Sequence, residues 1–188
     1  MLTVQSPPDK RNKNDLYSTP LHCTRLLLEN EKFSGSILEP ACGKGAITKV
    51  LHEYNLQYTA YDIETDFFTE TNQYTNIITN PPFCKSTDFL LHAKKIATNK
   101  IAFLLPINYL QSAERWDKVW QDKVFPLKTI YTFTRYLLME EDFRADGKCK
   151  SGMTLFSWFM FQKGYQGEPT IKWLDNAKFI CGKGDKLT

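Results

Sequence analysis

The chain has 188 residues, a net charge of +3 and 42% hydrophobic residues, so it can bury a sizeable core and we expect one domain over residues 1–188. The small positive charge permits a nucleic-acid partner without requiring one. The five cysteines include no C-x-x-C pair, which argues against a disulfide framework and a structural zinc site, and we expect no metal. No apolar run approaches the roughly 18 residues that span a bilayer, so we expect a soluble, cytoplasmic protein without a membrane partner.

The first half of the chain predicts a flexible arm, a helix and a βαβ unit. Residues 1–14 are polar and contain two prolines, which is typical of a flexible arm. Residues 21–31 have leucines at helical spacing, and we expect Ser18 or Thr19 to cap this helix with Pro20 at its first position. A strand over 36–39, a glycine turn, a helix over 46–54 and a second strand within 56–64 then form the βαβ unit.

The second half predicts strands at 76–80, 100–110 and 127–137, with a helix over 86–99. The strands are apolar without polar alternation, which indicates a mostly parallel sheet covered by helices on both faces. Residues 151–174 contain two strand-like runs around a glycine-bearing turn and predict an antiparallel C-terminal strand pair at the sheet edge, followed by a flexible tail over 175–188. The predicted fold class is therefore α/β and Rossmann-like.

The glycine turn after the first strand is suited to a cationic, nucleotide-like ligand. Gly43 and Gly45 follow a strand and open a helix, where the backbone can approach such a ligand. Thr48 replaces the third glycine of a dinucleotide motif, and the carboxylate of Glu39 at the strand tip would repel a pyrophosphate. S-adenosylmethionine fits better, because it carries a sulfonium and an ammonium and no phosphate. A tight turn without a ligand is the open alternative.

Two acidic positions further along are candidates for the rest of that ligand. Asp62 stands 17 positions after Gly45, where the Rossmann arrangement places its ribose-binding acid, although a solvated strand end or a helix cap would also place an aspartate there. Asp66 and Phe67 could hold the amine and the face of an adenine. An ordinary turn with Phe67 in the core fits the local sequence equally well.

The sequence Asn80-Pro81-Pro82-Phe83 begins at the last residue of the strand predicted at 76–80. The prolines restrict the backbone, so Asn80 is held extended, and its side-chain oxygen and a nearby main-chain carbonyl are presented from a stiff loop. Two acceptors at one point suit an exocyclic amine and make its nitrogen more nucleophilic without a strong base. Phe83 would stack on the ring that carries the amine, and a base in such a pocket must be single-stranded or flipped out of its duplex.

Together these motifs resemble the amino-group-specific DNA methyltransferases, in particular adenine-N6 enzymes of the small phage and prophage type. "LEPACGKG" resembles their cofactor motif, "YDIETDFF" their ribose- and adenine-binding acids, "NPPF" their catalytic tetrapeptide, and "DLYSTP" a segment that precedes the cofactor motif in one circular order. The resemblance covers about residues 15–174 and implies the class I S-adenosylmethionine-dependent methyltransferase fold. It implies a catalytic set of Asn80, Pro81, Pro82 and Phe83, and cofactor contacts at Tyr17, Thr19, Pro20, Glu39, Ala41, Gly43, Gly45, Asp62, Asp66 and Phe67.

The chain departs from that family in the size of its target-reading segments. Family members that read a defined site usually carry a large target-recognition region, whereas this chain offers only inserts at 106–126 and 135–152. We therefore expect no separate target-recognition domain and a short or loose specificity on DNA. The second insert has a composition suited to phosphate contact, with a solvated loop as the open alternative because acidic residues offset the charge. Its nucleic-acid-binding candidates are Arg135, Arg144, Lys148 and Lys150.

Three other functions remain open from the sequence. An RNA adenine-N6 methyltransferase would use the same pocket, because a splayed RNA base presents the same amine. A protein glutamine methyltransferase would act on another delocalised amine, but such enzymes typically carry an additional N-terminal domain. A non-catalytic, partner-dependent binding module would bind cofactor without turnover, although the intact tetrapeptide argues against it. The oligomeric state is left open.

Overall fold

The computed structural model describes residues 19–62, 65–135 and 154–180. These residues form a seven-stranded sheet with the strand order β2-β1-β3-β4-β6-β5-β7. β6 runs antiparallel to its neighbours β4 and β5, and the other neighbouring strands described are parallel to each other. The strands are β1 (Ile37–Glu39), β2 (Tyr58–Ala60), β3 (Tyr74–Thr79), β4 (Ala97–Pro106), β5 (Leu127–Phe133), β6 (Phe156–Gln162) and β7 (Thr170–Leu174).

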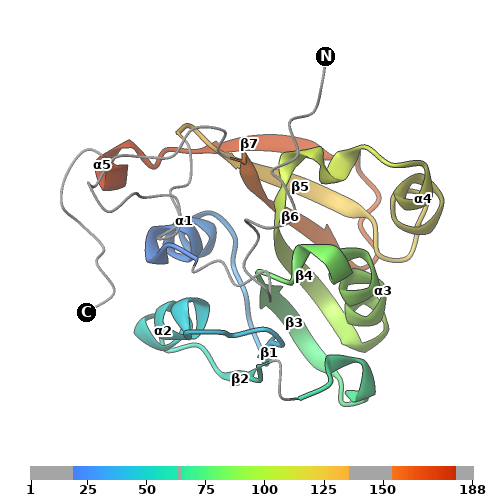
Figure 1. The fold of residues 1–188 in the computed structure, drawn as a ribbon, viewed down its shortest axis with the longest axis horizontal. Coiled ribbons are helices and arrows are strands. Elements are labelled where there is room, and N and C mark those ends of the chain that lie inside the picture. The colour runs from blue at the N-terminus through green and yellow to red at the C-terminus, as the bar shows by residue number, and fades with distance from the viewer. Residues whose placement is uncertain (1–18, 63–64, 136–153, 181–188) are drawn as a thin grey trace, which may run out of the picture.

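Helices cover both faces of the sheet. α1 and α2 lie on one side and α3 and α4 on the other (Figure 1). The helices are α1 (Leu21–Asn30), α2 (Ala46–Glu53), α3 (Ser86–Ile96), α4 (Ala113–Arg115) and α5 (Ala177–Ile180), with short 3-10 segments η2 (Phe67–Thr69), η3 (Phe83–Lys85) and η4 (Ile107–Leu110) and a π-helical turn η5 (Trp116–Trp120). Among the described residues, no helix combines the length and the apolar character that crossing a membrane would require.

Successive residues of the central strands enter different core clusters. In β4, Ile101 and Phe103 pack with α3, whereas Ala102 and Leu104 pack with α1 and α2. All four of these side chains are fully buried. Burial on both faces explains why these strands lack polar alternation, and the predicted α/β, Rossmann-like fold class is confirmed.

The last two strands are arranged differently from our expectation. They do not pair with each other, because β5 lies between them: β6 pairs with β4 and β5, and β7 lies at the edge, parallel to β5. The burial of each strand gives the physical reason. Residues 156–161 of β6 are all buried, so this strand needs a neighbour on both sides and a cover on both faces, whereas residues 170–173 of β7 are exposed.

Two local predictions are corrected at the ends of the described chain. α1 begins at Leu21 with Pro20 as its N-cap residue and no side-chain cap, so Thr19 does not cap the helix. Residues 175–180 are not a flexible tail: Asn176 is fully buried, its Oδ1 accepts a hydrogen bond from the Arg135 N–H at 3.0 Å, and Phe179 stacks on His22 with ring centroids 4.9 Å apart. The predicted arm at 1–14 and the tail beyond 180 lie outside the described residues.

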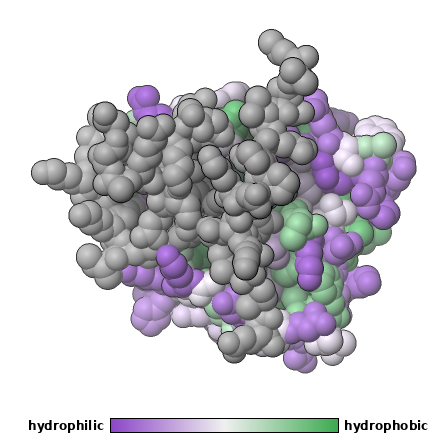
Figure 2. All heavy atoms as spheres, in the orientation of Figure 1, coloured by the Kyte–Doolittle hydropathy of each residue, from purple (hydrophilic) through white to green (hydrophobic). Residues whose placement is uncertain are grey.

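The insert at 106–126 contributes three buried side chains to the core. Tyr109, Val119 and Phe125 are buried on the α3 side of the sheet, and the Trp120 ring lies 6.1 Å from that of Phe161 on β6. Trp116 remains 59% exposed. The segment therefore covers one face of the sheet with these side chains, while polar side chains such as Gln111, Glu114 and Lys118 stay exposed. In the described part of the face drawn in Figure 2, hydrophilic residues surround a smaller apolar area at the lower right, where Figure 1 has α3.

Candidate active site

The candidate cofactor and catalytic residues meet at one edge of the sheet. Glu39 is the last residue of β1, Asp62 follows β2 by two positions, and Asn80 comes directly after β3. β1 lies between β2 and β3 and is parallel to both, so the carboxyl ends of the three strands lie side by side. In open α/β sheets, ligands bind outside these carboxyl ends.

The glycine turn is tied to the end of β2. Gly43 and Gly45 both have positive φ, +48° and +77°, and Gly45 is the N-cap residue of α2. The Gly43 N–H donates to Asp62 Oδ1 at 3.3 Å, and the Cys42 N–H donates to the Tyr61 carbonyl at 2.9 Å. The turn therefore takes a conformation that glycine adopts readily, and Asp62 helps to hold it.

Glu39 is a fully buried carboxyl group at the tip of β1. Its Oε1 accepts hydrogen bonds from the Thr79 hydroxyl at 2.6 Å and from the Ala41 N–H at 3.2 Å. Its Oε2 is buried and has no hydrogen-bond partner within the part of the chain that the structure describes. Burial, assisted by the nearby charge of Asp62, raises the pKa of Glu39 to about 8. The site thus contains a buried acceptor that a cationic or hydrogen-bond-donating ligand could satisfy.

The Asn80 tetrapeptide is supported from both of its ends. The Asn80 side-chain amide donates from Nδ2 to the Thr19 hydroxyl at 3.0 Å. The Phe83 ring lies 5.3 Å from the ring of Phe156, the first residue of β6. The Phe83 carbonyl accepts a hydrogen bond from the Ser86 hydroxyl at 2.9 Å as α3 begins. Phe156 was not predicted as a site residue, because nothing in the local sequence shows which strand lies beside Phe83.

Asp66 and Phe67 adopt the arrangement that was left open as the alternative. Asp66 Oδ1 accepts from the Phe68 N–H at 3.0 Å and caps η2. Phe67 is only 2% exposed, and its ring lies 4.8 Å from each of the rings of Phe89 and His92. Little of this ring remains for stacking on a ligand, whereas Asp66 is exposed and keeps acceptor capacity. An adenine contact by these two residues stays a prediction.

Three side chains form a hydrogen-bonded cluster that starts at the residue before Asp62: Tyr61, Glu70 and Tyr74. The Tyr61 hydroxyl donates to the Glu70 carboxylate and lies 2.6 Å from the Tyr74 hydroxyl, and Tyr74 donates to the same carboxylate at 3.1 Å. Burial and the acceptor Glu70 raise the pKa of Tyr61 far above its ordinary value, so the phenol stays a donor. This cluster joins the end of β2 to the start of β3 and was not visible in the sequence, because its members are spread along the chain.

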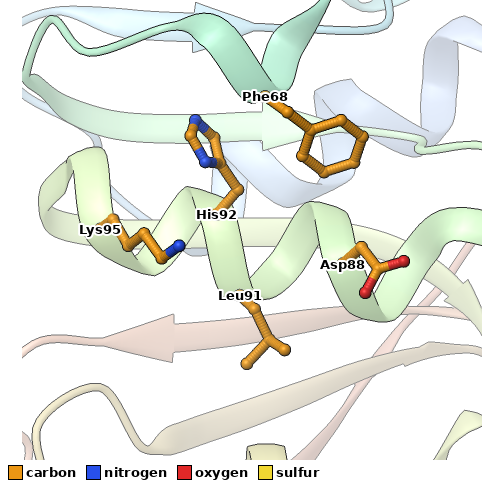
Figure 3. Close-up of a pocket in the computed structure, with 5 residues that line it drawn as sticks. All are labelled: Phe68, Asp88, Leu91, His92 and Lys95. Atoms are coloured by element: carbon orange, nitrogen blue, oxygen red, sulfur yellow. The ribbon is translucent and has the colours of Figure 1, made fainter.

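A shallow depression of about 490 Å³ lies on the outer side of α3. Figure 3 shows Phe68 and His92 close together on one side of this helix, with ring centroids 5.8 Å apart, and Asp88 and Lys95 along it. Its lining includes none of the predicted catalytic or cofactor residues. The depression is therefore separate from the residues gathered at the carboxyl ends of β1, β2 and β3.

The remaining site predictions are only partly covered by the structure. Arg135 is exposed just after β5, and its backbone is held by Asn176. Tyr17, Arg144, Lys148 and Lys150 lie outside the described residues. Within 19–62, 65–135 and 154–180, no group of three or more His, Cys, Asp or Glu side chains is placed to hold a metal ion.

No protein-family model and no curated protein matches this sequence. Solved structures do resemble the fold. A protein of Pyrococcus horikoshii described as a candidate RNA methyltransferase superposes with a TM-score of 0.57 at 15% identity over 83% of this chain and 91% of its own. A candidate class I S-adenosylmethionine-dependent methyltransferase of Listeria monocytogenes superposes with a TM-score of 0.57 at 14% identity, over 80% of this chain and 62% of its own. A candidate O-methyltransferase of Agrobacterium tumefaciens superposes with a TM-score of 0.55 at 12% identity, over 84% of this chain and 86% of its own. The chain therefore has a class I S-adenosylmethionine-dependent methyltransferase fold.

Proposed function

We propose that this chain, which has the class I methyltransferase fold, is an S-adenosylmethionine-dependent DNA methyltransferase that modifies the N6 amine of adenine with short or loose sequence specificity. One observation carries the proposal: Asn80-Pro81-Pro82-Phe83 stands at the carboxyl end of β3, beside the strand end that bears the buried Glu39. A stiff loop with an amide and an aromatic ring beside a cation-accepting carboxyl group suits methyl transfer to an exocyclic amine.

The residues at the sheet edge fit S-adenosylmethionine in charge and in hydrogen bonding. The unmatched Oε2 of Glu39 suits the positively charged methionine end, and Asp62 suits the ribose hydroxyls. The turn from Gly43 to Gly45 lets the backbone approach the ligand. When bound, the cofactor would supply a methyl group on a positively charged sulfur. Tyr17, Thr19, Pro20, Ala41, Asp66 and Phe67 are the further cofactor contacts that the sequence resemblance suggests.

The chain itself would act by holding and polarising the amine. The Asn80 side-chain oxygen and a neighbouring main-chain carbonyl would accept hydrogen bonds from the two N–H groups of adenine N6, which localises the nitrogen lone pair. Phe83, supported by Phe156, would stack on the base. The methylated amine would form as the carbon–sulfur bond of the cofactor breaks and S-adenosylhomocysteine leaves, and the amine would then lose one proton to solvent. Orientation and polarisation would therefore contribute more than proton abstraction before the transfer.

A loose specificity is proposed because the two inserts are short. Tyr109 and Phe125 of the first insert are buried in the core, so these two aromatic rings cannot stack on a base. Arg135, together with Arg144, Lys148 and Lys150, is proposed to contact phosphates, which would place the nucleic acid without reading its sequence. A flipped target adenine would reach the Asn80 loop.

RNA is the second candidate substrate. The proposed contacts address the adenine amine and its ring and do not involve the sugar, so they do not separate DNA from RNA. One of the similar solved structures is described as a candidate RNA methyltransferase.

The substrate class is tested by competition. The purified protein is incubated with methyl-labelled S-adenosylmethionine and a mixture of unmethylated duplex DNA, single-stranded DNA, total RNA and protein extract, and the label is counted in each fraction. We expect label in DNA. Label in RNA would support the second candidate, label in glutamine side chains would contradict both, and cofactor binding without transfer to any fraction would favour a partner-dependent or non-catalytic protein.

Substitution of Asp62 tests whether this residue contacts the cofactor. We expect Asp62→Ala to weaken S-adenosylmethionine binding about 10- to 100-fold, because it removes a charged acceptor for the ribose. Asp62→Asn should fall in between, since it keeps an acceptor for the Gly43 N–H that Asp62 binds. Titration calorimetry provides the dissociation constants, and Asp117→Ala, which changes an exposed aspartate of η5, is the matched control. Equal affinities of the wild type and both Asp62 variants would remove this residue from the site.

A further inference from the structure

Thr19 and Asn80 lie 61 positions apart in the chain and meet through their side chains. Thr19 is 5% exposed, and its hydroxyl oxygen lies 3.0 Å from Asn80 Nδ2. The amide nitrogen donates in this contact, so the carbonyl oxygen at the other end of the planar amide points away from Thr19. The contact therefore distinguishes the donor end of the Asn80 side chain from its acceptor end.

The orientation of this amide matters for the proposed reaction. A target amine needs an acceptor, and Asn80 supplies one only when its oxygen is directed at the substrate. Rotation of the amide by 180° would turn its NH₂ group toward the substrate amine. The N–H groups of the two amines would then repel each other, and one of the two acceptors would be lost. A protein that uses asparagine in this role benefits from a fixed partner for the nitrogen.

Thr19 is itself held firmly by the fold. It precedes α1, whose first turn is attached to β6 because Trp158 Nε1 donates to the Cys23 carbonyl at 3.0 Å. Trp158 and Cys23 are both fully buried. β6 also supplies Phe156, which packs on Phe83. The same strand thus supports the amide end of the tetrapeptide through α1 and its aromatic end directly.

We propose that Thr19 is a positioning residue: by accepting a hydrogen bond from Asn80 Nδ2, it directs the Asn80 carbonyl oxygen toward the target amine. This inference rests on the proposed function of Asn80. It gives Thr19 a role different from the cofactor contact expected from its sequence context.

The test compares Thr19→Val, which keeps the side-chain shape without the hydroxyl, with Thr19→Ser, which keeps the hydroxyl. We expect the valine variant to lose about 10-fold or more in kcat with an unchanged cofactor dissociation constant, and the serine variant to stay within about threefold of the wild type. Thr24→Val is the matched control, because Thr24 is buried in α1, which Thr19 precedes, and its hydroxyl has no hydrogen-bond partner within the described residues. Weaker cofactor binding by Thr19→Val with normal kcat at saturation would overturn the inference.

A second readout separates this inference from the proposed function. In ¹⁵N-labelled protein, the side-chain NH₂ signal of Asn80, assigned by its loss in Asn80→Ala, should move in Thr19→Val and stay in place in Thr19→Ser and Thr24→Val. In the wild type its protons should exchange with water more slowly than those of the exposed Asn72, which can be measured even if Thr19→Val does not fold. A wild type that methylates nothing would contradict the proposed function. The inference would be overturned if the Asn80 signal stayed in place in Thr19→Val, or if its protons exchanged with water as fast as those of Asn72.

Discussion

Replacing Asn80 with alanine is expected to lower the kcat for methyl transfer at least about 100-fold, because it removes one of the two acceptors that hold the target amine. The dissociation constant for S-adenosylmethionine should stay within about twofold, since Asn80 is proposed to contact the substrate and not the cofactor. Single-turnover transfer of a labelled methyl group, together with calorimetry of cofactor binding, measures both quantities on the same protein.

A matched control for this substitution is Asn72→Ala. Asn72 is exposed in the loop ahead of β3, and only its backbone N–H is used in the hydrogen bond to Glu70, so alanine preserves that contact. We expect this variant to turn over like the wild type. Near-wild-type turnover by Asn80→Ala would show that the catalytic assignment of the tetrapeptide is wrong.

Cofactor affinity is expected to rise with pH up to and through about 8, because the Glu39 carboxyl must ionise to attract a cation and its pKa is raised to about 8 by burial. Below that pH the free protein holds a proton on Glu39, which binding would release. The slope from this group is at most about tenfold in affinity per pH unit. Calorimetry at pH 6.5, 7.5 and 8.5 measures the affinity. Repeating it in buffers with different ionisation enthalpies gives the number of protons released when the cofactor binds.

Glu39→Gln separates this effect from the titration of the ligand. The α-amino group of S-adenosylmethionine titrates in a similar range. The pH dependence of affinity in Glu39→Gln therefore arises from the ligand alone, and the difference from the wild type is the contribution of Glu39. S-adenosylhomocysteine, which lacks the sulfonium charge, should show a weaker dependence in the wild type. Identical pH profiles for the wild type and Glu39→Gln would contradict the proposed role of the carboxyl group.

The same carboxyl group affects folding. The Glu39 carboxyl ionises near its ordinary pKa of 4.5 in the unfolded chain and near 8 in the folded protein. Between these values the folded protein holds a proton that the unfolded chain has lost, so the free energy of unfolding falls as pH rises from about 4.5 to about 8, by on the order of 5 kcal/mol. Glu39→Gln lacks this contribution, and denaturant titrations of both proteins at pH 5 and pH 8 measure it.

The fold was predictable because its strands and helices have strong local patterns. The unalternating apolar strands indicated a sheet covered on both faces, and burial of Ile101 and Ala102 in different clusters confirms it. The order of the last strands was not predictable in this way. The position of β6 between β4 and β5 depends on which apolar surfaces meet across long stretches of chain, and sequence proximity favours the simpler pairing of β6 with β7.

The gathering of the candidate residues at one edge of the sheet was predictable from their places at strand ends. Glu39, Asp62 and Asn80 were placed at neighbouring strand ends because parallel strands bring their carboxyl ends to one edge. The partners that tune these residues were not predictable. Thr79 reaches Glu39 across 40 positions and Thr19 reaches Asn80 across 61, and periodicity carries no information on such contacts.

The position of the methyl group in DNA tests the central claim most directly. Unmethylated DNA is incubated with the protein and S-adenosylmethionine whose methyl group carries deuterium, then digested to nucleosides and analysed by mass spectrometry. The proposed function predicts trideuterated N6-methyldeoxyadenosine in the wild-type reaction and its loss with Asn80→Ala. Label on the N4 amine of cytosine, on a carbon atom of any base, or in no nucleoside of DNA would contradict it.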